Sequence, residues 1–184
     1  MPLTPLHYPI AYLIYRVDRR LVLPGLIVGS MLPDIEIPFL LIIFGFERPS
    51  RLVLHSLIGA ATLGTLISSV ITIYLYPSLI SIFFRANPAE VREKCRLSSS
   101  LVLSCLLGNF SHILLDYINH SYNPLFWPFT TPNEILLSPI CYALGGVEKA
   151  SLIVQTTLVA ALIIIVALLP KKHGDIWRSL LIGT

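Results

Sequence analysis

The sequence predicts an all-α membrane protein, a polytopic helical bundle with about four spans. The 184-residue chain is 55% hydrophobic, carries only 12% charged residues and has a mean hydropathy of +0.79. A soluble domain of this length would carry about a quarter charged residues. Several apolar runs also reach the length of about 20 residues that a helix needs to cross a bilayer. We therefore expect one membrane domain over residues 1–184, with membrane lipid as a partner.

The N-terminal apolar stretch from Leu6 to Tyr15 is too short to span a bilayer, so it predicts an interfacial or half-buried helix. The first apolar run of sufficient length covers residues 21–46. It contains Pro24, Pro33 and Pro38, which interrupt helical hydrogen bonding. We expect a broken span there.

Three further runs are cleaner. Together with the first they give expected spans at residues 21–46, 52–84, 97–119 and 150–169. The segment 121–149 is rich in proline and aromatic residues and predicts a loop with interfacial pieces. Its Trp127 and the neighbouring phenylalanines suit the headgroup level of a membrane.

The basic residues predict the orientation of this bundle. With four spans, ten of the 13 Lys and Arg fall on the side that holds the N-terminus, the loop at 85–96 and the C-terminus. Basic residues concentrate on the cytoplasmic side, so we expect a multi-pass cell-membrane protein with both termini in the cytoplasm. If residues 21–46 formed a re-entrant hairpin instead, this bias would disappear.

The remaining composition excludes several classes of site. No basic cluster is interleaved with aromatic residues, so no nucleic-acid partner is expected. The three cysteines are scattered without a CxxC pair, which indicates neither a thiolate zinc site nor a disulfide framework. The sequence leaves the oligomeric state open.

One polar stripe stands out in the third span. Asn109, His112, Asp116 and Asn119 follow one another at spacings of 3, 4 and 3, which places them on one helical face. An ionisable side chain at mid-bilayer costs about 2.5–3.5 kcal/mol, so it usually faces the protein interior and has a partner. A His-x3-Asp pair can direct an imidazole nitrogen and a carboxylate oxygen at one metal ion. The alternatives are a proton or ion path and a structural His–Asp hydrogen bond.

Other ionisable residues could complete a metal site. Asp34 follows Pro33 in the broken first span, and Glu36 lies two residues further on. His55 precedes small residues that let a neighbouring helix approach closely. Each has a simpler reading, because Pro-Asp also occurs in surface turns and a lone histidine near a helix end is often interfacial. His120, like His7, could be a solvated cap.

The ordered motifs MPLTPLHYP, GSMLPDIE, LHS and GNFSHILLDYINHSYNPLFWPF resemble the membrane-bound metal-dependent hydrolase-like families. These include the LexA-regulated inner-membrane type and are distantly similar to zinc-dependent phospholipase C. The resemblance covers about residues 1–130. It implies that the motif positions, namely His7, Asp34, Glu36, His55, His112 and Asp116, surround a metal.

The position of His7 conflicts with a simple four-span arrangement. His7 would start on the cytoplasmic side, whereas His55 and Asp116 would lie towards the outer side. Either His7 is not a ligand, or the first 46 residues do not thread simply through the membrane.

A metal in this setting would serve hydrolysis. Imidazoles and carboxylates suit zinc, with manganese as the alternative, and such an ion lowers the pKa of a bound water to about 7. Glu36 would act as general base and His120 as a hydrogen-bond donor at the rim. We expect an ester or phosphoester substrate, lipid or lipid-linked. The competing classes are a proton- or ion-coupled transporter and a non-catalytic structural or regulatory membrane protein.

Overall fold

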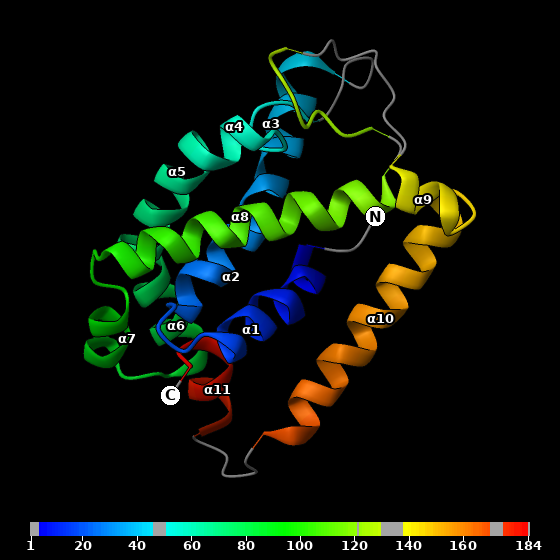
Figure 1. Ribbon diagram of the computed structural model, residues 1–184. Helices are drawn as coiled ribbons and strands as arrows, with labels where there is room; N and C mark the ends of the chain where they lie inside the picture. Colours follow the sequence, from blue (N-terminus) through cyan, green and yellow to red (C-terminus); the bar gives the residue numbers. More distant parts are fainter. Residues whose placement is uncertain (1–3, 46–50, 121, 130–137, 170–174, 184) are drawn as a thin grey trace.

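The computed structural model describes residues 4–45, 51–120, 122–129, 138–169 and 175–183, and these contain helices and loops without a strand. Four helical rods are long and apolar enough to cross a membrane: Leu23–Phe44, Leu57–Phe84, Ser99–Asn119 and Val147–Leu168 (Figure 1). The prediction of an all-α membrane bundle with four spans is confirmed. Parts of the expected loop at 121–149, together with residue 46 of the expected first span, lie outside the described residues.

The first rod is broken, as its prolines predict. It consists of α2 (Leu23–Met31), the 3-10 turn η2 (Pro33–Ile35) and α3 (Glu36–Phe44). Pro33 has no backbone N–H, and its ring would clash with the carbonyl four residues earlier in an α-helix. The tighter turn that results leaves the Asp34 side chain buried inside the bundle.

The second rod changes its helical winding several times. Its segments are α4 (Leu57–Gly59), the π-helix η3 (Ala60–Gly64), α5 (Thr65–Val70), the π-helix η4 (Ile71–Leu75) and α6 (Tyr76–Phe84). The Ser56 side chain caps the start by accepting the Gly59 N–H at 3.0 Å. Pro77 follows η4 and cannot donate to the preceding turn, which accounts for the wider winding there.

Helix α8 (Ser99–Asn119) packs most extensively against α2. Glycines let the two backbones touch: a Cβ atom added at Gly29 would lie 2.4 Å from the Cys105 carbonyl oxygen. One added at Gly108 would lie 2.6 Å from the Leu26 carbonyl oxygen. Small residues allow such close helix contacts in membranes. The contact holds the C-terminal end of α2 against the polar stripe of α8.

The N-terminal segment forms η1 (Thr4–His7) and α1 (Tyr8–Val17). Helix α1 packs against α2 and α10, and the turn at residues 18–22 joins it to the start of α2. One face of α1 is buried, for example at Ala11 and Tyr15. Of the two predicted alternatives, an interfacial or a half-buried helix, the structure therefore has the half-buried one. Because α1 and α2 form a hairpin, His7 lies beside the C-terminal end of α2. Residues 4–45 therefore do not thread simply through the bundle, so His7 can lie on the same side as His55 and Asp116.

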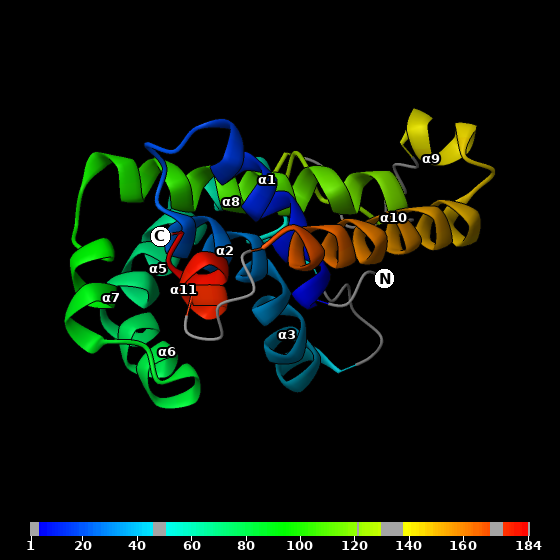
Figure 2. The same cartoon turned by 90° about the horizontal axis from the view of Figure 1, so that it is seen from below.

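The remaining helices are α7 (Pro88–Lys94), α9 (Pro139–Ala143), α10 (Val147–Leu168) and α11 (Asp175–Leu181). Helix α10 lies at the edge of the bundle in both views (Figures 1 and 2), and only 11% of its most apolar 18-residue stretch is buried. The hydroxyls of Tyr8 and Tyr76 donate to the carbonyls of Leu180 and Leu181 at 2.8 and 2.7 Å. These bonds fasten α11 to the bundle.

Candidate metal centre

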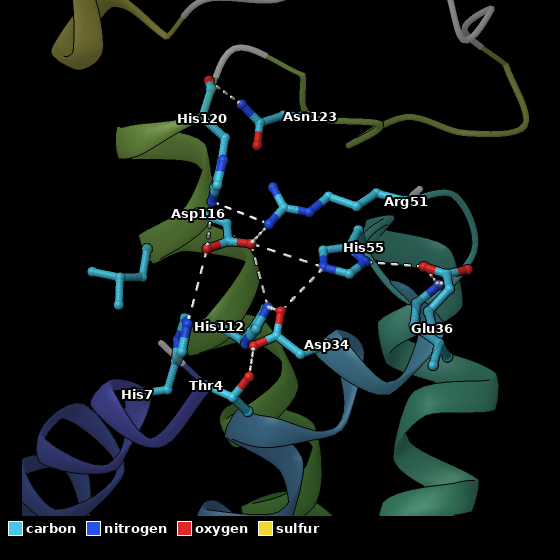
Figure 3. A network of polar contacts seen from close by, with 12 residues as sticks. Thr4, His7, Asp34, Glu36, Arg51, His55, His112, Asp116, His120 and Asn123 are labelled. Carbon is cyan, nitrogen blue, oxygen red and sulfur yellow. Dashed lines mark hydrogen bonds and ion pairs between the residues drawn. The ribbon is translucent and has the colours of Figure 1, made fainter. Parts of the chain in front are cut away.

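Four ionisable side chains from three separate segments converge inside the bundle. Asp34 comes from η2, His55 from the loop before α4, and His112 and Asp116 from α8 (Figure 3). One ligand atom from each lies within 4.8 Å of the ligand atoms of the other three. The i, i+4 spacing on α8 places His112 and Asp116 side by side, and the proline break brings Asp34 to them. The position of His55 follows from no such local pattern, because the loop that carries it is held by tertiary contacts.

Hydrogen bonds at the far side of each ring fix the two imidazoles. His112 Nδ1 is 2.8 Å from the Ser30 carbonyl oxygen, and His55 Nδ1 is 2.9 Å from Glu36 Oε2. Both partners can only accept, Glu36 as a carboxylate, so each Nδ1 carries the proton and each Nε2 presents a lone pair. Such contacts orient the histidine ligands of metals.

The atoms that face the centre have no hydrogen-bond partner among the described residues. They are His55 Nε2, His112 Nε2 and Asp116 Oδ2, and all three are buried. The Arg51 Nη2 atom lies 3.3 Å from Asp116 Oδ2 as an ion pair without hydrogen-bond alignment. Lone pairs that face one another out of contact with water repel, and burying them is costly. A cation among them would remove this cost.

The spacing of these atoms fits a small ion. His112 Nε2 lies 3.4 Å from Asp116 Oδ2 and 3.6 Å from Asp34 Oδ1. His55 Nε2 lies 3.8 Å and 4.0 Å from the same two oxygens. Ligand atoms around a tetrahedral ion with bonds of about 2.1 Å are about 3.4 Å apart. All four ligand atoms lie within 4.8 Å of one another, so a contraction of the group would complete a two-histidine, two-carboxylate site.

His7 lies next to this group rather than within it. Its ring stacks on the His112 ring with centroids 4.0 Å apart, and its Nε2 is 3.9 Å from Asp116 Oδ1, the oxygen that faces away from the four-atom group. Burial lowers the pKa of His7 to about 4. Burial also lowers the pKa of His55, although its hydrogen bond to Glu36 opposes the shift. Both rings are therefore neutral near pH 7, the state in which imidazole binds metals.

Glu36 lies on the far side of the His55 ring from the centre. The sequence predicts it as a general base, which would have to face the centre. Its carboxylate accepts the backbone N–H groups of Leu52, Val53 and Leu54 at 2.7–3.2 Å, in addition to the His55 ring. Both carboxylate oxygens of Glu36 thus accept hydrogen bonds, and they lie on the side of the His55 ring that faces away from the centre. The carboxylate fastens the loop at 51–56 and orients the His55 ring.

His120 lies at the rim of this cluster. Its Nε2 is 3.4 Å from Asp116 Oδ1, and its side chain, at 12%, is the most exposed of the ionisable groups in the cluster.

Three contributors were missed in the sequence. Arg51 reaches both Asp116 and His120, the Thr4 hydroxyl donates to Asp34 Oδ2 at 2.6 Å, and the Ser30 carbonyl holds His112. Arg51 had one usable signal, because it lies four residues before His55 at the edge of an apolar run. A backbone carbonyl such as that of Ser30 leaves no mark in the sequence.

A family model matches most of the chain. The family model of the YdjM inner membrane protein matches residues 7–180. No curated protein matches the chain, and no solved structure matches it. The matched range begins at His7 and includes every ionisable residue of the cluster described above. With its four apolar helices, the chain is a multi-pass membrane protein, and it belongs to the YdjM inner membrane protein family.

Proposed function

We propose that this chain is a membrane-embedded metal-dependent hydrolase that acts on an ester or phosphoester. The observation that carries the proposal is the convergence of His55 Nε2, His112 Nε2 and Asp116 Oδ2, three buried atoms that face one another without hydrogen bonds. Side chains that only locked the helices together would pair with each other instead. Two imidazoles and two carboxylates favour zinc, with manganese as the alternative.

The residues around the centre would have separate roles in this reaction. Zinc held by these side chains would act as a Lewis acid, and a water bound to it as an additional ligand would have its pKa lowered to about 7. Glu36 and the Ser30 carbonyl hold the two imidazoles in the tautomer that leaves Nε2 free. Thr4 orients Asp34. His120, the most exposed member, is the group placed to exchange a proton with a ligand that enters from the rim.

An apolar groove supports a lipid or lipid-linked substrate. It has a volume of about 480 Å³ and is lined almost wholly by apolar atoms from α2, α6, α10 and α11. Three lining residues, Pro5, Tyr8 and Met31, are chain neighbours of Thr4, His7 and Ser30 at the centre. In a bilayer a hydrocarbon chain would fill such a groove, because water gains no polar partners there.

Elemental analysis of detergent-purified protein tests the proposal. We expect about one divalent ion per chain, mainly zinc, and its loss in His112→Ala and Asp116→Ala. Asn119→Ala is a matched control, because Asn119 is buried on the same stripe but its side chain bonds the Leu115 carbonyl. If both substituted proteins retained the wild-type metal content, the hydrolase assignment would fail. Proton-driven solute uptake by vesicles without a hydrolysis product would support a transporter instead.

A further inference from the structure

Arg51 is a buried cation at the edge of the metal centre. Only 6% of its side chain is exposed, and its Nη2 donates to His120 Nε2 at 3.1 Å and lies 3.3 Å from Asp116 Oδ2 (Figure 3). The next three residues donate their N–H groups to Glu36, so the backbone that carries Arg51 is fixed by the carboxylate that orients His55. A guanidinium is costly to bury, and its retention there indicates an anionic partner.

Asp116 can satisfy Arg51 only in part. Its Oδ2 is also one of the four atoms that converge on the candidate ion, 3.4 Å from His112 Nε2 and 3.8 Å from His55 Nε2. An ion held there would draw on the same lone pairs, and its charge would repel the guanidinium nearby. Both contacts that the described residues make with the guanidinium use Nη2, although the group has five N–H donors.

The charges leave room for an anion. Asp34 and Asp116 contribute two negative charges, whereas a divalent ion and Arg51 contribute three positive charges. Glu36 also carries a negative charge, but its oxygens accept three backbone N–H groups and the His55 Nδ1–H on the far side of that ring from the centre. Within the group that faces the ion there is therefore one positive charge in excess. A phosphoryl group matches it, because its oxygens accept the planar fork of a guanidinium and also bind a metal ion. A neutral carboxylic ester would leave this charge uncompensated.

We infer that Arg51 and the metal together bind a phosphoryl anion, so that the substrate is a phosphoester rather than a carboxylic ester. This inference rests on the proposed metal centre. Arg51 is the residue that selects the substrate class, and His120 closes the same side of the site.

Binding of inorganic phosphate to metal-loaded protein, freed of excess metal, tests the inference by calorimetry. We expect Arg51→Gln to retain the metal and to bind phosphate roughly 10- to 100-fold more weakly, because charged hydrogen bonds are lost. Arg51→Lys, which keeps the charge without the fork, should bind several-fold more weakly than wild type. Arg92→Gln, an exposed substitution on α7, should match wild type.

The outcomes separate the two proposals. Wild-type protein without metal would overturn both. Wild-type affinity for phosphate in metal-loaded Arg51→Gln would overturn the role of Arg51 alone, and so would metal-dependent cleavage of carboxylic esters without phosphate binding. If Arg51→Gln loses its metal, Arg51→Lys decides: unchanged affinity overturns the inference, and reduced affinity supports it. Competition by phosphatidic acid in micelles against glycerol phosphate then shows whether the phosphoryl group comes from a lipid headgroup or a soluble ester.

Discussion

The two central histidines show how single residues prepare the site. The Nδ1–H of His55 donates to the Glu36 carboxylate, and the Nδ1–H of His112 donates to the Ser30 carbonyl. Each ring therefore presents its Nε2 to the centre. These hydrogen bonds orient the rings without an ion. A preoriented ligand loses less conformational freedom when it binds one. In the proposed metal centre, Glu36 would raise the metal affinity without touching the metal.

Glu36→Gln tests this indirect role. The amide oxygen can still accept from His55, but the charge is lost and one acceptor oxygen becomes a donor facing backbone N–H groups. We expect zinc affinity to fall roughly 10- to 100-fold, as for other partners of metal-binding histidines. Competition with a chromogenic chelator measures this affinity. Glu148→Gln, an exposed substitution on α10, should leave it unchanged; equal affinities for both variants would contradict the orienting role.

At the scale of elements, the α2–α8 contact sets the distance between Asp34 and the α8 ligands. Gly29 and Gly108 remove side chains where the two backbones meet, so the helices come closer than larger residues would permit. The same contact places the Ser30 carbonyl against His112 Nδ1. Helix packing and ligand geometry therefore depend on the same pair of glycines.

Gly29→Leu should destabilise the bundle and weaken the centre together. A Cβ atom at this position would lie 2.4 Å from the Cys105 carbonyl oxygen, so α2 and α8 must separate. Overpacking of this kind costs about 1–3 kcal/mol or more. We expect a lower thermal midpoint in detergent and less bound metal. The matched substitution Ala160→Leu, on an exposed position of α10, should change neither. Normal metal content in Gly29→Leu would show that the site does not depend on the α2–α8 contact.

Much of the fold follows from the sequence because membrane helices are set by local properties. Run length predicts the four rods, and the prolines predict the break at residue 33. The stripe from Asn109 to Asn119 predicts which face of α8 points inwards. The course of α1 and the loop at 51–56 depend on tertiary contacts, such as the N–H groups that Glu36 accepts. These contacts determine where His7 and Arg51 lie, so neither position could be predicted from spacing alone.

At the scale of the whole molecule, the basic residues mark one end of the bundle. The turn at 18–22, the loop at 85–98 and α11 lie together, opposite the end that holds α9 and the loop at 51–56 (Figure 1). The described basic residues at the first end are Arg16, Arg19, Arg20, Arg85, Arg92, Lys94, Arg96 and Arg178. Those at the other end are Arg51, which is buried, and Lys149. We propose that the first end faces the cytoplasm.

Labelling of introduced cysteines checks this orientation. Positions 92 and 148 are exposed at opposite ends, and the native Cys95, Cys105 and Cys141 are buried, so they should react slowly with a maleimide. A membrane-impermeant maleimide should label Glu148→Cys in cells whose inner membrane is intact. It should label Arg92→Cys only after that membrane is permeabilised. The reverse pattern would place the basic end outside.

The way in which three segments contribute to one centre constrains biosynthesis. Asp34 belongs to the first rod and His55 to the loop just before the second, whereas His112 and Asp116 lie in the C-terminal half of the third. During synthesis the first two rods are made while their ionisable groups still lack these partners. The centre becomes complete only once α8 has entered the membrane beside them, so the proposed metal would have to bind after insertion of the third rod.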